Sequence, residues 1–234
     1  MTNLFHFSRR VSGVLPLIAV YLLIGAGPLF AWSARDYPKY NHKTYTSYAP
    51  FNERIDFNNI NFALLNAAVL YETNRQRASK GKVPLQHSVA MEKAATGHSR
   101  DMARLNFFSH DSPVPGKATM VDRMAKFGVT RGFRAENIAS TFGIEYQAGK
   151  PVFSPEQNGG FFSYKFKGDP IPAHTYSGLA RSVVGQWMKS PGHRRNILKD
   201  EFRFLGVGTA YFEKREFFNM AHFNFTQNFG SEDA

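Results

Sequence analysis

Three side chains of the sequence, His110, Glu136 and His193, are of types that can exchange protons or bind a metal ion. His110 follows the aromatic pair Phe107-Phe108, just after a stretch with the pattern of a helix. Glu136 is the lone carboxylate of a short extended run, and His193 directly follows a Pro-Gly pair. Because each of the three lies on an anchored segment, we expect them to converge on one hollow of the folded domain.

A helix before His193 is predicted to hold this histidine in place. Its apolar residues recur at steps of three and four and form one core-facing stripe: Leu179, Val183, Val184, Trp187 and Met188. Ser177 is of a type that caps a helix start, and Pro191 ends the helix because proline has no N–H to donate. Gly192 then permits a tight turn that aims His193. The same features also fit a capped helix end with an exposed histidine.

Three further helices are predicted, over residues 60–79, 88–105 and 119–127. In the second of these, Ser88 is expected to be the N-cap, and His98 lies on the apolar stripe. A histidine in that place is expected to be a core residue that is hydrogen-bonded to a backbone carbonyl. In the third helix, Asp122 and Arg123 are expected to tether the loop after His110.

The remaining regular elements are predicted to be strands, over residues 130–140, 203–212 and 217–229. Aromatic residues alternate with polar neighbours in the last strand, which predicts one buried face. Glu213–Arg215 is expected to be a three-residue hairpin turn between the last two strands. Antiparallel strands at the end of a helical chain imply an α+β fold with helices stacked on the sheet.

Residues 141–178 are rich in glycine, proline and aromatic residues and are predicted to be a long insertion. A connection of this length in a compact domain is usually functional or disordered. One hypothesis is a flap beside the hollow, with Phe161, Phe162 and Tyr164 as its apolar tip. The alternative is a hairpin that packs on the outer surface.

The N-terminal residues 1–33 have the pattern of an export signal. Two arginines precede an uncharged apolar run over residues 11–30, and Ala-Trp-Ser at 31–33 offers small residues where a signal peptidase cleaves. The run also has about the ~20 residues that span a bilayer, so cleavage and a retained anchor both stay open. Either way, the domain is expected to be secreted, periplasmic or in the cell envelope. Residues 34–59 are expected to be a linker or a strap laid over the domain.

Composition narrows the classes of partner. The 234 residues suffice for one domain with extra segments, and the formal charge of +11 predicts attraction to anionic wall polymers, lipid headgroups or polysaccharide. The charges are scattered without a long basic run, which together with the export signal argues against nucleic acid. Cysteine is absent, which excludes disulfides, a lipoprotein anchor on an N-terminal cysteine and any cysteine-based metal site or nucleophile.

A series of short motifs occurs in one order along the chain: Asn74-Arg-Gln-Arg77, Pro84-Leu85, His98-Ser-Arg-Asp-Met102, Phe108-Ser-His110, Glu136-Asn137-Ile138-Ala139, Trp187-Met-Lys-Ser-Pro-Gly-His193-Arg-Arg-Asn-Ile-Leu198, Gly206-Val-Gly208 and Thr226-Gln-Asn-Phe229-Gly230. Each motif alone is weak, but together they resemble the bacterial branch of the CAP superfamily, the SCP-like extracellular domains. This family includes cysteine-rich secretory proteins, venom allergens and plant pathogenesis-related proteins. The resemblance covers residues 60–230 and implies a three-layer α-β-α sandwich with a small antiparallel sheet.

The resemblance also implies a central cavity lined by two histidines and two glutamates. His110, Glu136 and His193 match three of these four positions, and Ser190 stands where the second glutamate would be. The three matching residues are candidates to hold a divalent metal such as Zn²⁺, whereas Ser190 lacks the carboxylate of a full four-ligand site. Supporting roles around the cavity are assigned to His98, Asn137 and Trp187.

Three functions are compatible with this cluster. The first is a binding module for a lipid, a small apolar molecule, a peptide or a cell-wall fragment, with or without a metal. The second is a hydrolase, in which two imidazoles and a carboxylate hold Zn²⁺ with an open position for water, or a histidine acts as general base on Ser109 or Ser190. The third is a buried hydrogen-bonded network with a purely structural role. A membrane is expected to be a partner only through an uncleaved N-terminal segment.

Overall fold

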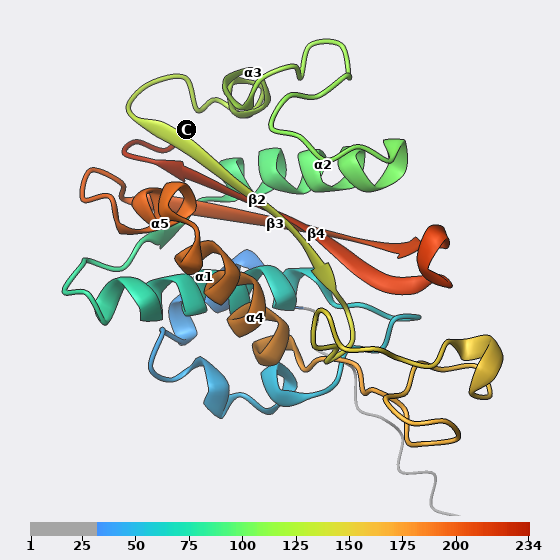
Figure 1. Ribbon diagram of the computed structural model, residues 1–234. Coiled ribbons are helices and arrows are strands. Elements are labelled where there is room, and N and C mark those ends of the chain that lie inside the picture. Colours follow the sequence, from blue (N-terminus) through green and yellow to red (C-terminus); the bar gives the residue numbers. More distant parts are fainter. Residues whose placement is uncertain (1–31) are drawn as a thin grey trace, which may run out of the picture. The chain divides into compact units, whose positions relative to one another are not determined.

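A four-stranded sheet of order β1-β3-β4-β2 lies at the centre of the structure, a computed structural model that describes residues 32–234 (Figure 1). The strands are β1 (Gln86–His87), β2 (Arg134–Phe142), β3 (Phe204–Lys214) and β4 (Met220–Gly230). β4 pairs antiparallel with both β2 and β3, so the three predicted strands are confirmed, with shifted ends. β1 is an additional short strand that pairs parallel with β3 and makes the sheet mixed.

Helices cover both faces of this sheet (Figure 1). α2 (Val89–Leu105) and α3 (Met120–Ala125) lie on one face. α1 (Phe62–Ala78), α4 (Tyr176–Lys189) and α5 (Pro191–Leu198) lie on the other face. The predicted α+β class with α-β-α layers is therefore confirmed.

α2 lies almost directly on β3 because two strand positions carry no side chain. A Cβ at Gly206 would come within 2.0 Å of the backbone nitrogen of Glu92, and a Cβ at Gly208 within 2.0 Å of that of Thr96. Ser88 is the N-cap of α2, as predicted. This close packing fixes the distance between α2 and the sheet, and hence the positions from which the α2 side chains extend.

The main apolar core lies between the sheet and helices α1 and α4. Phe223, Phe225 and Phe229 of β4 are fully buried in it, as predicted for this face. The prediction of only one buried face is wrong, because all 11 residues of β4 are buried and α2 covers its other face. Trp187 of α4 packs edge-on against Phe225, with ring centroids 6.5 Å apart. Gln227 is buried on the same face, and its amide nitrogen donates a hydrogen bond to α1. This core anchors α4, which carries the segment that ends at His193.

The junction before His193 differs from the prediction. Thr175, not Ser177, is the N-cap of α4, and its hydroxyl accepts a backbone N–H of the first turn at 3.0 Å. Pro191 ends α4 but also begins α5, at the first helical position where its missing N–H leaves no hydrogen bond unmade. Gly192 therefore lies inside a helix. His193 is held by the first turn of α5 rather than by a tight turn.

The connection between β3 and β4 is longer than the predicted hairpin turn. β3 continues to Lys214, so Glu213–Arg215 is not the turn. A 3₁₀ turn follows over Arg215–Phe217, and Phe218 and Asn219 then adopt left-handed φ angles of 51° and 56°. These two residues reverse the chain into β4.

The insertion at 141–178 packs beside the β3–β4 connection, at the end of the sheet away from α3 (Figure 1). Phe162 is only 8% exposed and contributes to a small core with Ile144, Ile171 and Met220. The expectation that Phe162 forms an apolar flap tip is therefore wrong, because its ring fills this core. Phe161 and Tyr164 stay partly exposed.

The sequence alone does not decide whether residues 34–59 are a linker or a strap laid over the domain. In the structure this segment, which we call the strap, contributes buried aromatic residues to the main core. It contains three 3₁₀ turns, over Ala34–Lys39, Tyr45–Ser47 and Ala49–Asn52. Just before it, Trp32 is 6% exposed, and its ring centroid lies 5.1 Å from that of Phe51 and 6.4 Å from that of Tyr71 of α1. Cleavage after Ser33 would thus remove a core side chain.

Most of the predicted export segment falls on residues 1–31, which lie outside the described residues. Among residues 32–234, no helix has the length and apolar character needed to cross a membrane.

Candidate functional site

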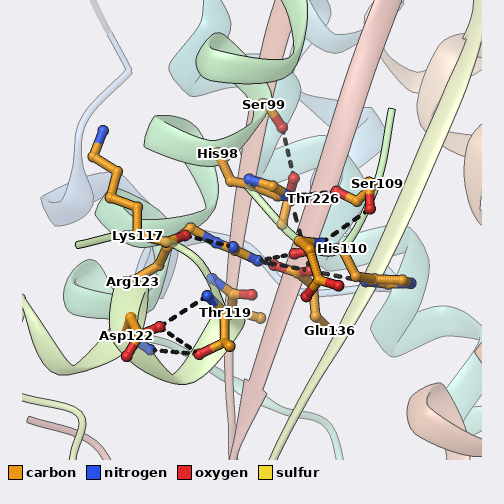
Figure 2. Close-up of polar contacts among 12 residues, drawn as sticks. His98, Ser99, Ser109, His110, Lys117, Thr119, Asp122, Arg123, Glu136 and Thr226 are labelled. Carbon is orange, nitrogen blue, oxygen red and sulfur yellow. Dashed lines mark hydrogen bonds and ion pairs between the residues drawn. The ribbon is translucent and has the colours of Figure 1, made fainter. Parts of the chain in front are cut away.

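His110 and Glu136 are in direct contact, as the sequence predicts for part of the site (Figure 2). The Nδ1 atom of His110, in the loop after α2, lies 2.9 Å from Oε1 of Glu136 on β2. A carboxylate only accepts hydrogen bonds, so Nδ1 carries the proton and Nε2 is the nitrogen available to a ligand. The Glu136 side chain is 3% exposed and the His110 side chain 54% exposed. A buried acid therefore orients an imidazole that solvent can reach.

Arg123 of α3 binds the same carboxylate. Its Nη2 atom donates to Oε1 of Glu136 at 2.9 Å and to Oε2 at 2.7 Å, and both side chains are almost completely buried (Figure 2). Nη2 also donates to the backbone carbonyl of His110 at 2.9 Å. The predicted tether of the loop by Arg123 is thus confirmed, but its ion pair with Glu136 is not apparent from the sequence. Asp122 instead accepts hydrogen bonds from Thr119, the N-cap of α3.

His98 supports the loop from α2. It is fully buried, and its Nε2 atom lies 2.9 Å from the backbone carbonyl of Ser109, which confirms the expected bond to a carbonyl. The same atom lies 4.0 Å from Oε1 of Glu136. Burial lowers the pKa of His98, and the nearby charge of Glu136 opposes this shift with a smaller effect. His98 therefore acts as a neutral hydrogen-bonding residue behind the site.

His193 approaches the site from the other side of β2, which is an edge strand. Neighbouring residues of a strand point to opposite faces, so Glu136 faces α2 and α3 while Asn137 faces α4 and α5. Asn137 donates to the backbone carbonyl of His193 at 3.2 Å and accepts from Asn196 of α5 at 2.8 Å. Burial first, and the neighbouring His110 second, lower the pKa of His193. His110 is thus close enough to His193 to contribute to the lowered pKa of His193.

Trp187 and Ser190 hold the junction between α4 and α5. The indole Nε1 of Trp187 donates to the carbonyl of Ile138 on β2 at 3.0 Å, so its supporting role is structural. The backbone N–H of Ser190 donates to the carbonyl of Trp187 at 3.1 Å, and its own carbonyl accepts from Arg194. No hydrogen bond among the described residues joins Ser190 to His110 or Glu136. The structure therefore unites His110 with Glu136, places His193 nearby and leaves Ser190 outside their network.

A hollow of about 300 Å³ opens beside the His110–Glu136 pair. Its lining combines polar and apolar side chains: His110, Asp111, Thr119, Met120, Val121 and Glu136. The N-terminal turn of α3 thus forms one wall, and the loop after α2 forms the other. A ligand in this hollow would meet an imidazole and apolar surface together.

The donor atoms do not fit a metal shared by His110, Glu136 and His193. Both oxygens of Glu136 accept from the Arg123 guanidinium, and Oε1 also accepts from His110. A metal ion at this carboxylate would have to share it with a buried cation. Within residues 32–234, no group of three or more His, Asp or Glu side chains is arranged to hold a metal ion.

The chain belongs to the CAP family, the cysteine-rich secretory protein family, whose model matches residues 70–229. It is 32% identical over 136 residues to the uncharacterized protein YkwD of Bacillus subtilis (strain 168), a match that covers 58% of this chain and 38% of YkwD. It is 27% identical over 140 residues to the uncharacterized membrane protein YlbC of the same organism, covering 60% of this chain and 30% of YlbC. The match therefore spans less than two fifths of either relative.

Solved structures that are similar to the chain include the following two. An extracellular protein containing a SCP domain from Bacillus anthracis str. Ames has 26% sequence identity and a TM-score of 0.47, over 72% of this chain and 40% of that chain. An outer surface protein from Borrelia burgdorferi has 16% identity and a TM-score of 0.47, over 76% of this chain and 97% of that chain.

Proposed function

We propose that this chain is an exported CAP-family binding module that takes a peptide or cell-wall fragment into the hollow at His110 and Glu136. The observation that carries the proposal is the 2.9 Å contact between His110 Nδ1 and a buried Glu136 oxygen at the wall of this hollow. The apolar N-terminal run of the sequence supports export. One similar protein is named a membrane protein and another an extracellular protein, which agrees with a location outside the cytoplasm.

The chemistry of the hollow favours a ligand with both polar and apolar parts. Nε2 of His110 is an acceptor for an N–H or O–H group of the ligand, while Met120 and Val121 offer apolar contact. A volume of about 300 Å³ lies at the lower end of small-molecule pockets, which suits a short fragment better than a lipid chain. The formal charge of +11 favours attraction to an anionic wall polymer that carries such fragments.

A second candidate function, hydrolysis, is supported by the same contact. An imidazole whose Nδ1–H is held by a carboxylate has an Nε2 atom that can accept a proton from water. Ser109 is a poor nucleophile here, because its hydroxyl accepts the Asp111 N–H at 3.1 Å and caps the loop. A hydrolase at this site would therefore activate a water molecule as the nucleophile and would not form a serine ester.

Isothermal titration calorimetry with a soluble peptidoglycan fragment tests the proposal on the purified chain. His110→Ala is expected to weaken binding at least about tenfold, since a lost hydrogen bond to a buried or charged network is worth roughly 1.5–3 kcal/mol. His42→Ala is the matched control, because His42 lines a different hollow between the strap and α1. Equal affinity of wild type and His110→Ala would contradict the proposal. Mass analysis of the same fragment after incubation separates binding from hydrolysis.

A further inference from the structure

The ion pair between Arg123 and Glu136 places a permanent positive charge inside the site. The side chains of Arg123 and Glu136 are 2% and 3% exposed, and one guanidinium nitrogen contacts both carboxylate oxygens. We propose that Arg123 is the built-in cation of this centre: it occupies the carboxylate that a divalent metal would need, and it positions the His110 loop without one. The proposal concerns the same hollow as the proposed function, but its test requires no peptide or cell-wall fragment.

Three hydrogen bonds already occupy the Glu136 carboxylate, which has about four lone-pair sites in all. Oε1 accepts from Arg123 and from His110, and Oε2 accepts from Arg123 at 2.7 Å. A Zn²⁺ bonded to either oxygen at ~2.0–2.2 Å would lie within roughly 5 Å of the guanidinium. Two cations on one buried carboxylate would leave an excess positive charge in a place with little water to screen it. Metal binding would therefore require Arg123 to leave its position.

Arg123 also positions the His110 loop through backbone contacts. Its guanidinium donates to the backbone carbonyls of His110 at 2.9 Å, Lys117 at 3.1 Å and Ala118 at 3.3 Å. These contacts join the two ends of the loop from 110 to 118 to the carboxylate on β2 (Figure 2). A metal ion bound through side chains would not hold these carbonyls.

The placement of the guanidinium is set by the carboxylate and the loop rather than by a complete set of hydrogen bonds. Arg123 Nε is buried and has no partner among the described residues, although such a group is costly to leave unpaired. The Thr119–Asp122 capping box fixes the first turn of α3 and hence the base of this side chain.

The test measures metal binding by the full chain, purified without a polyhistidine tag or a chelator. Elemental analysis is expected to find less than stoichiometric metal, and EDTA is expected to leave the melting temperature unchanged. Zn²⁺ titration of the wild type is expected to show no binding that His110→Ala removes. One metal per chain, a melting temperature lowered by EDTA, or Zn²⁺ binding lost in His110→Ala would each overturn the proposal.

Arg123→Met supplies the positive arm of the test, because it frees the carboxylate while filling a similar volume. This variant is expected to bind Zn²⁺ at least about tenfold more tightly than the wild type, in a manner that an added His110→Ala abolishes. Arg104→Met is the control, since Arg104 pairs with Asp101 at the surface and its side chain is 66% exposed. A folded Arg123→Met chain without such a gain would refute the role of Arg123 as the competing cation.

A lysine variant covers the case in which Arg123→Met fails to fold. Arg123→Lys keeps the positive charge but loses the planar fork that reaches carboxylate and carbonyl together. It is expected to melt at a lower temperature than the wild type and still to show no Zn²⁺ binding that depends on His110. Zn²⁺ binding of that kind in the lysine variant would contradict the proposal, because charge alone should exclude the metal.

Discussion

Replacing Glu136 by glutamine is expected to destabilise the domain by about 3–5 kcal/mol, because it leaves the Arg123 guanidinium buried without a counter-charge. Glutamine has nearly the same shape, and its carbonyl oxygen can still accept from Arg123 or His110. The variant therefore removes the charge and little of the packing.

The magnitude follows from the contact itself. Two unit charges 2.7 Å apart attract by roughly 6 kcal/mol at an effective dielectric constant of about 20. The hydrogen bonds that glutamine retains offset about 1–2 kcal/mol of this loss. The remainder agrees with the cost of removing one partner of a buried ion pair.

Urea unfolding at neutral pH measures the difference, with Glu145→Gln as the matched control. Glu145 pairs with Arg54 at 3.2 Å, but these side chains are 43% and 55% exposed, so its loss is expected to cost at most about 1 kcal/mol. The combined variant Arg123→Met/Glu136→Gln is expected to lose less than the sum of the two single variants. If Glu136→Gln costs no more than Glu145→Gln, the buried pair does not hold the site together.

Three further results are expected. Trp32→Ala should lower the free energy of unfolding by about 3–5 kcal/mol, and a loss below about 1 kcal/mol would show that this ring is not part of the core. Gly208→Ala should cost at least about 1–3 kcal/mol, since the added methyl meets the backbone of α2, and a neutral result would contradict the close packing of α2 on β3. Burial lowers the pKa of His98, so the fold favours its neutral form; its contribution is complete above the unfolded value of about 6.5 and is lost as the pH falls below it. Urea unfolding between neutral and mildly acidic pH should show a smaller loss in His98→Gln than in the wild type, and identical slopes would refute this assignment.

The sequence predicts the elements whose signals are local. The apolar stripe and the N-cap Ser88 predict α2 to within a residue, because a helix and its cap depend on neighbours along the chain. The place of His98 on that stripe correctly predicts its burial and its bond to a carbonyl. The α+β layering follows in the same way from helices that precede antiparallel strands.

Other features depend on contacts that no local pattern encodes. Ser177 and Thr175 are both of capping types, and tertiary packing decides that α4 begins after Thr175. The sequence predicts that Arg123 tethers the loop after His110, but not that its side chain is buried in an ion pair, since arginine is seldom buried unless it is paired. Its partner lies thirteen residues away on another element, so only the fold brings the two charges together.

Only part of the predicted site is present in the structure, because the contacts between its residues also depend on the fold. His110 and Glu136 meet because the loop after α2 lies against the beginning of β2, and Arg123 of α3 binds both residues. Ser190, placed by analogy of position, belongs to the junction between two helices and serves their backbone hydrogen bonds. The resemblance of motifs identifies which residues to consider, while hydrogen-bond partners determine what each one does.

Amide chemical-shift mapping of the ¹⁵N-labelled chain during titration with soluble peptidoglycan fragments tests the binding site most directly. We expect saturable shifts that are largest at residues 109–111, at Thr119–Val121 and at Glu136, around the hollow beside α3. Saturable shifts confined to the hollow between the strap and α1, around Tyr37 and His87, or the absence of any saturable shift, would contradict a binding site at His110 and Glu136.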